Sequence, residues 1–257
     1  MTIPKIIFII PYKNRYHQKI HFDVYMKYIM EDYNKDDYEI YYSHQCDNRH
    51  FNRGGIKNLG FLAMMKKYPN DFKNITFVFN DVDTLPFLKN QLKYETTKGN
   101  IKHFYGFDFT LGGIISVNGD DFLKMNGFPN YWGWGLEDNR LQQRAKYFNI
   151  NIDRSIFYDF HDQRILNFDK NPNKIVTKNP VSAGKINNGY FNCGLSSLCN
   201  INYKIENEYI NIYNFNDAIL PYEKESFYEK NCETEGSIMR DKSRFSGQLK
   251  MKIGINQ

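Results

Sequence analysis

The sequence predicts an α/β fold in which a mixed, mostly parallel sheet is flanked by helices. Residues 6–10 form a continuous apolar, β-branched run, which is typical of a strand buried on both faces of a sheet. Further apolar runs alternate with segments of helical period, as in α/β proteins. Polar residues follow the early strands directly. Because ligands of open parallel sheets bind beyond the carboxyl ends of the strands, these polar residues are the first candidates for a site.

Each element rests on a local pattern. The first strand ends at a turn that carries two cations, and a helix with apolar residues on one face follows the second strand. The third strand runs straight into Asn80, and a Gly-Gly pair precedes the fourth. The predicted elements are, in chain order, strand 6–10, helix 16–33, strand 38–42, helix 58–68, strand 75–79, strand 112–117, helix 119–125 and a helix that begins near residue 137.

Beyond residue 148 the periodic pattern weakens. Residues 156–161 and 203–212 have strand character, and between them lies a polar segment, 169–188, rich in Asn, Lys, Pro and Gly. The sequence contains no internal repeat and no linker. We therefore predict a single domain over residues 1–205, followed by a C-terminal extension, 206–257, whose role the sequence does not indicate.

Composition excludes several classes. The net charge of +5 is scattered along the 257 residues, which suits an anionic ligand but is no nucleic-acid signature. The four cysteines lack C-x-x-C spacing, so a zinc site built from them is not expected. No run approaches the roughly 20 apolar residues of a membrane span, and the first residues lack a signal peptide. On these grounds we expect a cytoplasmic protein with no membrane span.

A candidate metal and phosphate site follows the third strand. Asp81 and Asp83 point the same way from an extended segment and offer the oxygen ligands that hard divalent cations prefer. The topology places cations nearby, and arginine suits phosphate oxygens because its fork donates two parallel hydrogen bonds. His161 is the favoured nitrogen ligand, with His103 as a rival that spacing does not exclude. The nearby cations are Lys13, Arg15 and Arg53.

Residues 126–138, Asn-Gly-Phe-Pro-Asn-Tyr-Trp-Gly-Trp-Gly-Leu-Glu-Asp, contain both tryptophans of the chain and end on two carboxylates. Glycines between the indoles allow the backbone to approach a bound ring, and an exposed Trp face suits the apolar face of a sugar. Glu137 and Asp138 fall in the first turn of a helix, where the helix dipole favours their ionised forms. The alternative interpretation of this segment is a structural aromatic corner.

Taken in order, these segments resemble the β-1,4-galactosyltransferase family. The resemblance runs from about residue 3 to 205 and is most specific in Trp-Gly-Trp-Gly-x-Glu-Asp; segment 192–198 and Tyr203 resemble the family's end. It implies a GT-A fold and an inverting transfer of a hexose or N-acetylhexosamine from a UDP-sugar to a hydroxyl of an acceptor saccharide or glycoconjugate. It also implies Mn²⁺ as cofactor and a β-linked product.

The resemblance assigns roles residue by residue. Asp138 is the base that deprotonates the acceptor, and Asp83 and His161 are the metal ligands. Glu137, Trp132, Leu136 and Lys174 are the acceptor-binding residues. The nucleotide-sugar residues are Pro11, Tyr12, Lys13, Arg15, Phe51, Asn52, Arg53, Asp81, Val82 and Trp134. The polar segment from about residue 162 to 188 corresponds to a lid that orders over the donor.

Departures from the family pattern shape the expected specificity. Lys13 stands where the family usually has Arg, and Tyr158 stands where some members have a methionine metal ligand. Leu136 and Asn139 replace the usual Gly and Asp of the acceptor pocket. Thr110 lies where galactose-transferring members carry a tyrosine against the donor 2-position, so we expect room for an N-acetyl group.

Two other functions remain open at this point. The first is a catalytically inactive sugar- or nucleotide-binding module of the same fold, against which the intact carboxylates argue. The second is a metal-dependent nuclease or nucleotidyltransferase. That function requires a third clustered carboxylate and a continuous basic face, neither of which the sequence reveals.

Overall fold

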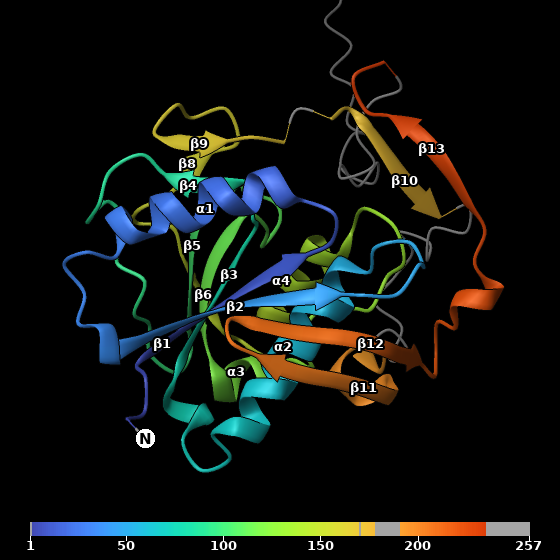
Figure 1. Ribbon diagram of the computed structural model, residues 1–257, viewed down its shortest axis with the longest axis horizontal. Helices are drawn as coiled ribbons and strands as arrows, with labels where there is room; N and C mark the ends of the chain where they lie inside the picture. Colours follow the sequence, from blue (N-terminus) through green and yellow to red (C-terminus); the bar gives the residue numbers. More distant parts are fainter. Residues whose placement is uncertain (1, 170, 178–190, 235–257) are drawn as a thin grey trace, which may run out of the picture.

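The computed structural model describes residues 2–169, 171–177 and 191–234 and contains one large mixed sheet (Figure 1). Its strand order is β11-β12-β2-β1-β3-β6-β5-β7, and β8 also pairs with β5. The strands from β12 to β3 are parallel, whereas β6 is antiparallel to β3 and β5. The sheet is thus mixed and mostly parallel, as expected for the GT-A fold that the sequence resemblance implies.

The strands of the large sheet are β1 (Ile6–Tyr12), β2 (Tyr38–Gln45), β3 (Thr76–Asn80), β5 (Asn100–Gly106), β6 (Ile114–Asn118), β7 (Asn151–Asp153), β8 (Tyr158–Asp159), β11 (Leu198–Glu206) and β12 (Tyr209–Asp217). Two small sheets pair β4 (Thr84–Pro86) with β9 (Ile165–Asn167) and β10 (Asn173–Thr177) with β13 (Phe227–Asn231). The helices are α1 (Tyr16–Ile29), α2 (Arg53–Lys67), α3 (Gly119–Lys124) and α4 (Glu137–Tyr147). Short 3-10 turns are η1 (Lys35–Asp37), η2 (Phe72–Asn74), η4 (Leu195–Ser197) and η5 (Tyr222–Lys224).

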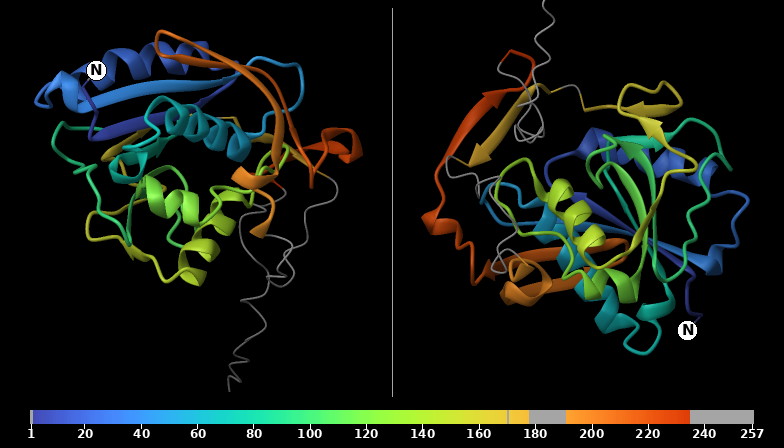
Figure 2. Two further views of the ribbon diagram at one scale, coloured as in Figure 1. Left: turned by 90° about the horizontal axis from the view of Figure 1, so that it is seen from below. Right: turned by 180° about the vertical axis from the view of Figure 1, so that it is seen from behind.

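Two hydrophobic cores enclose the sheet. Figure 2 shows α1 on one face and α2, α3 and α4 on the other. Ile6, Phe8 and Ile10 of β1 pack toward α1, whereas Ile7 and Ile9 pack with the α2, α3 and α4 side chains. Because successive strand side chains alternate in direction, a strand covered on both faces has to be apolar throughout. The run that predicted the fold is therefore fully buried.

The early elements match the prediction, but some boundaries are shifted. Helix α1 ends at Ile29, four residues before the predicted end at residue 33. Helix α2 begins at Arg53, five residues before the predicted start at residue 58. The Asn52 side chain caps this helix by accepting a hydrogen bond of 2.8 Å from the backbone N–H of Gly55. The glycines after Arg53 masked the helical pattern in the sequence. The earlier start matters because it puts Arg53 in the first turn, at the edge of the sheet.

The C-terminal region differs more from the prediction. The single strand expected at 203–212 is a hairpin of β11 and β12, and β12 lies parallel to β2 within the large sheet. A boundary after residue 205 would therefore cut the sheet, since β12 runs on to Asp217. Strand β13 pairs with β10, away from the large sheet (Figure 1). Within the described residues, no helix has the length and apolar character needed to span a membrane.

Candidate active site

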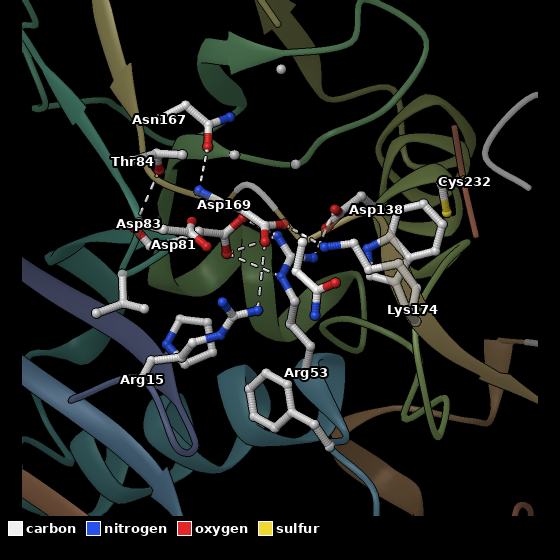
Figure 3. A pocket seen from close by; sticks show the side chains of 18 of the residues that line it. Arg15, Arg53, Asp81, Asp83, Thr84, Asp138, Asn167, Asp169, Lys174 and Cys232 are labelled. Carbon is white, nitrogen blue, oxygen red and sulfur yellow. Dashed lines mark hydrogen bonds and ion pairs between the residues drawn. The ribbon is translucent and has the colours of Figure 1, made fainter. Parts of the chain in front are cut away.

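A cleft of about 570 Å³ lies at the carboxyl ends of β1 and β3, beside the loop that follows β2. This is the edge at which the sequence placed the polar residues (Figure 3). The sequence-predicted residues that line the cleft are Pro11, Lys13, Arg15, Phe51, Arg53, Asp81, Val82, Asp83, Thr110, Trp134, Asp138 and Lys174. Asp83 and Asp138 therefore face one cavity, although 55 positions separate them in the chain (138 minus 83).

Arg53 connects the two halves of this cleft. Its Nη1 donates to Glu137 Oε1 at 2.8 Å and to Asp138 Oδ2 at 2.7 Å. Its Nε and Nη2 donate to both oxygens of Asp81 at 2.5–3.0 Å. Burial alone would raise the pKa of Asp81, but the charges of Arg53 and Lys57 outweigh burial and hold that pKa below its usual value. Arg53 was expected to bind the nucleotide, and the structure instead commits its guanidinium to these three carboxylates.

Lys57, which the sequence reasoning missed, is the second cation of the cluster. It lies one turn after Arg53 on α2 and is 1% exposed. Its Nζ lies 3.6 Å from Asp138 Oδ1 and 3.7 Å from Asp81 Oδ1. The i, i+4 spacing from Arg53 was the signal that could have identified it. Asp138 Oδ1 is buried and accepts no hydrogen bond within the described residues, so its ion pair with Lys57 offsets the charge of this oxygen.

Asp83 lies among like charges on the other side of the cleft. Burial and the carboxylates of Asp81 and Asp169 raise the pKa of Asp83 to about 7. Asp169, which follows β9, is a second residue that the sequence reasoning missed. It comes from the polar segment where the periodic pattern is lost, and no local signal marked it. A carboxyl group in this position favours a neighbouring cation, because a cation offsets the repulsion.

The donor set at Asp83 fits a hard divalent cation in part. Carboxylate oxygens are suitable ligands, and such ions often take one or two carboxylates and complete their shell with phosphate and water. Among the described residues, however, no three His, Cys, Asp or Glu side chains are placed to hold a metal together. His161 is exposed and does not line the cleft; its ring packs 5.3 Å from that of Phe160. Its role as a ligand stays a prediction.

His103, the rival ligand, has a structural role. It is fully buried, and its Nε2 lies 3.0 Å from the carbonyl oxygen of Tyr105 and 3.1 Å from that of Gly112. Its Nδ1 accepts a hydrogen bond of 3.0 Å from Arg154 Nε. Burial and then the charge of Arg154 lower the pKa of His103 to about 3. Both ring nitrogens are engaged, so this histidine is not available to a metal.

The two tryptophans point to different places. Trp134 lines the cleft, and its backbone N–H donates to the carbonyl of Ile175 at 2.7 Å. Trp132 is 2% exposed, stacks on Phe215 at 5.3 Å and donates from Nε1 to the carbonyl of Leu220 at 3.0 Å. The expectation that Trp132 contacts the acceptor therefore needs correction. Trp132 anchors the segment, and Trp134 meets the cavity.

Other predicted residues also support the site from outside the cleft. Tyr12 packs in the core against His44, and Asn52 is fully buried as the cap of α2. Glu137 is 2% exposed and faces Arg53; burial and the charge of Asp138 raise its pKa, against the opposing charge of Arg53. Leu136 has a left-handed backbone with φ of 71° and does not line the cavity. None of these side chains is placed to touch a ligand in the cleft.

Lys13 and Thr110 line the cleft with limited freedom. The Lys13 ammonium donates to the backbone carbonyls of Asp47 and Arg49 at 2.5 and 2.7 Å, and burial lowers its pKa. It therefore holds the loop after β2 and is not free for a phosphate. Thr110 is 2% exposed, and its Oγ1 donates to the carbonyl of Phe107 at 3.2 Å. The expected lid lies partly outside the described residues, which omit 170 and 178–190.

Comparisons with known proteins identify the sequence relatives of this chain. The N-terminal region of glycosyl transferase group 7 matches residues 1–95, and the N-terminal domain of galactosyltransferase matches residues 91–164. The chain is 31% identical over 164 residues to β-1,4-galactosyltransferase 4 of Mus musculus, covering 60% of this chain and 46% of that protein. It is 32% identical over 161 residues to β-1,4-galactosyltransferase 1 of Bos taurus, covering 58% of this chain and 38% of that protein. It thus spans less than half the length of these curated relatives.

Solved structures show the same fold. The catalytic domain of Drosophila β-1,4-galactosyltransferase 7 in complex with xylobiose superposes with a TM-score of 0.61 at 22% identity. That match covers 82% of this chain and 94% of the other. A mutant of the same enzyme in complex with manganese, UDP-Gal and xylobiose matches with the same TM-score at 20% identity. At these identities the likeness concerns the fold.

Proposed function

We propose that this chain, which belongs to the β-1,4-galactosyltransferase family (glycosyltransferase family 7), is an inverting, metal-dependent glycosyltransferase. It moves a hexose or N-acetylhexosamine from a UDP-sugar to a hydroxyl of an acceptor saccharide and makes a β-linkage. The observation that carries the proposal is the single cleft that holds both Asp83 and Asp138, with Trp134 in its wall. The expected cytoplasmic location is wrong for this family, whose β-1,4-galactosyltransferases are Golgi membrane enzymes.

The donor side of the cleft is the end of β1 and β3. Phe51 and Val82 offer apolar surface for the nucleotide, and Arg15 offers a cation for the diphosphate. Asp83 is the residue that would hold Mn²⁺, with His161 as the further predicted ligand. When bound, that ion supplies positive charge where the leaving diphosphate develops negative charge.

The acceptor side is built around Asp138. A single displacement needs one base, and the carboxylate of Asp138 is the group that accepts the proton of the attacking hydroxyl. Arg53 and Lys57 orient this carboxylate and neutralise its partners. Attack from the face opposite the leaving group inverts the anomeric centre. Trp134 shields the reacting atoms from water that would hydrolyse the donor.

Donor choice is proposed to depend on Thr110. Its small side chain at the cleft wall leaves room for the N-acetyl group of UDP-GalNAc or UDP-GlcNAc. Turnover of UDP-GalNAc compared with UDP-Gal tests this, with Thr110→Tyr as the variant that should restore a preference for UDP-Gal. Exclusive use of UDP-Gal by the unmodified protein would refute the donor assignment but leave the transferase proposal intact.

The proposal as a whole is tested by a screen of UDP-sugars against simple saccharide acceptors with added Mn²⁺. We expect UDP release that depends on both acceptor and metal. Release of UDP from no donor, combined with measurable UDP binding, would instead identify an inactive nucleotide-binding module of the same fold.

A further inference from the structure

Asp169 projects into the cleft between two cations that come from distant parts of the chain (Figure 3). Its Oδ2 accepts a hydrogen bond of 2.5 Å from Lys174 Nζ, and its Oδ1 lies 3.6 Å from Arg15 Nη2. Its backbone N–H donates to Asn167 Oδ1 at 2.9 Å, and the preceding N–H, of Phe168, donates to the carbonyl of Asp83 at 2.9 Å. The carboxylate is therefore held beside Asp83 by the backbone.

A count of charges shows why this contact matters. Four Lys or Arg residues line the cleft in the described part of the chain: Lys13, Arg15, Arg53 and Lys174. Lys13 is occupied by loop carbonyls, and Arg53 is occupied by three carboxylates. Arg15 and Lys174 remain, and the only ion pairs found for them in that part of the chain are with Asp169. Arg15 and Lys174, the two cleft cations that are not held by loop carbonyls or by the carboxylate cluster, thus share the carboxylate of Asp169.

We propose that Asp169 occupies the place of the donor's diphosphate, and that the donor displaces it from Arg15 and Lys174. The inference rests on the proposed function and deepens it, because it moves Lys174 from the acceptor side to the donor side. A diphosphate carries more charge and more acceptor oxygens than one carboxylate, and Arg15 can bind it through two parallel hydrogen bonds. The exchange costs the two ion pairs of Asp169, so the internal anion weakens donor binding.

The consequence is opposite to that of an ordinary binding residue. Removing the charge of Asp169 should tighten the binding of UDP, since Arg15 and Lys174 then have no internal competitor. Each pair is partly exposed, with side-chain exposures of 35% for Arg15, 14% for Lys174 and 28% for Asp169, so the expected gain is modest. We expect roughly a fivefold lower Kd, the scale of a partly exposed ion pair.

The test is calorimetric titration of UDP into Asp169→Asn and the unmodified protein, in EDTA so that a metal cannot contribute. Asp120→Asn is the matched control, because it removes one carboxylate of α3 and its two ion pairs, with Lys73 and Lys98, outside the cleft. Lys174→Met should weaken UDP binding. Asp169→Asn should raise UDP affinity by a smaller factor in the Lys174→Met variant than in the otherwise unmodified protein. A parallel titration with Mn²⁺ alone, followed by electron paramagnetic resonance, reports the metal site.

An unchanged or weaker UDP affinity in Asp169→Asn would overturn the inference. So would a loss of Mn²⁺ affinity in that variant, because Asp169 would then be a metal ligand. These results differ from failure of the proposed function, in which the unmodified protein itself binds no UDP with or without Mn²⁺. A gain of affinity equal to that of Asp120→Asn would show a general charge effect and would also overturn the assignment.

Discussion

Replacing Arg53 by Met tests whether this residue holds the site together. The change removes the hydrogen bonds from Arg53 to Asp81, Glu137 and Asp138 and leaves Lys57 as the one cation of the cluster in the described structure. The cluster changes from two cations against three carboxylates to one against three. Arg53 is 15% exposed, and Glu137 and Asp138 are 3% and 7% exposed at their side chains, so water compensates little.

The expected loss is large because breaking a buried ion pair leaves an uncompensated charge. Such a break costs about 3–5 kcal/mol, and for a chain of this size each kcal/mol lowers Tm by roughly 2–4 °C. We therefore expect Arg53→Met to unfold roughly 10 °C lower at pH 8. Without Arg53, the pKa of Asp81 loses the main charge that holds it below its usual value, and the pKa of Glu137, which burial already raises, rises further. The deficit should then be greatest at high pH and shrink as the pH falls toward 5.

Thermal unfolding followed by circular dichroism at pH 8 and pH 5 measures both effects. Arg164→Met is the matched control, since Arg164 makes an exposed pair with Asp162 outside the cleft, and its midpoint should not change. A Tm for Arg53→Met within about 2 °C of that of the unmodified protein at pH 8 would refute the reasoning, because such a shift corresponds to a loss of less than about 1 kcal/mol. A deficit that is equal at both pH values would refute the electrostatic explanation.

Two further predictions concern backbone and pH. At Leu136, whose φ is 71°, glycine should be more stable than alanine by about 1 kcal/mol, the reverse of their order inside a helix, because only glycine adopts a left-handed backbone without strain. Urea unfolding of Leu136→Gly and Leu136→Ala measures the difference, and equal midpoints would contradict it. Folding lowers the pKa of His103 from 6.5 to about 3. The free energy of unfolding is therefore unaffected by the titration of this histidine above pH 6.5, and it falls by roughly 1.4 kcal/mol per pH unit as the pH decreases from 6.5 toward 3. His103→Gln should lose that acid sensitivity, and an identical pH profile in the two proteins would refute it.

The first half of the fold was predictable because its signals are local. The buried run of β1 and the polar residues after the early strands follow directly from side-chain alternation and from the topology of parallel sheets. The pairing of β10 with β13 was not predictable, because it joins Asn173 to Asn231 and depends on contacts far apart in the chain. The placement of β12 beside β2 has the same cause.

The site shows the same division. The strand-end positions located Asp83 and Arg53, but no pattern showed that Arg53 would bind three carboxylates, because two of them lie 84 and 85 residues away. Trp132 and Trp134 belong to one motif, and no local signal showed that Trp132 would be the buried indole, because its partner Phe215 lies far along the chain. Asp169 lies where periodicity is lost, so its approach to Asp83 required the structure.

The central claim, that Asp138 is the base of a UDP-sugar transferase, is tested most directly by comparing Asp138→Asn with the unmodified protein in an acceptor-dependent UDP-release assay with Mn²⁺. Titration of UDP and Mn²⁺ into both proteins verifies that the donor site is intact. We predict that UDP binding stays within a few-fold while transfer falls by at least about 10²-fold, the contribution of a general base. Transfer by Asp138→Asn at a rate close to that of the unmodified protein would contradict the account.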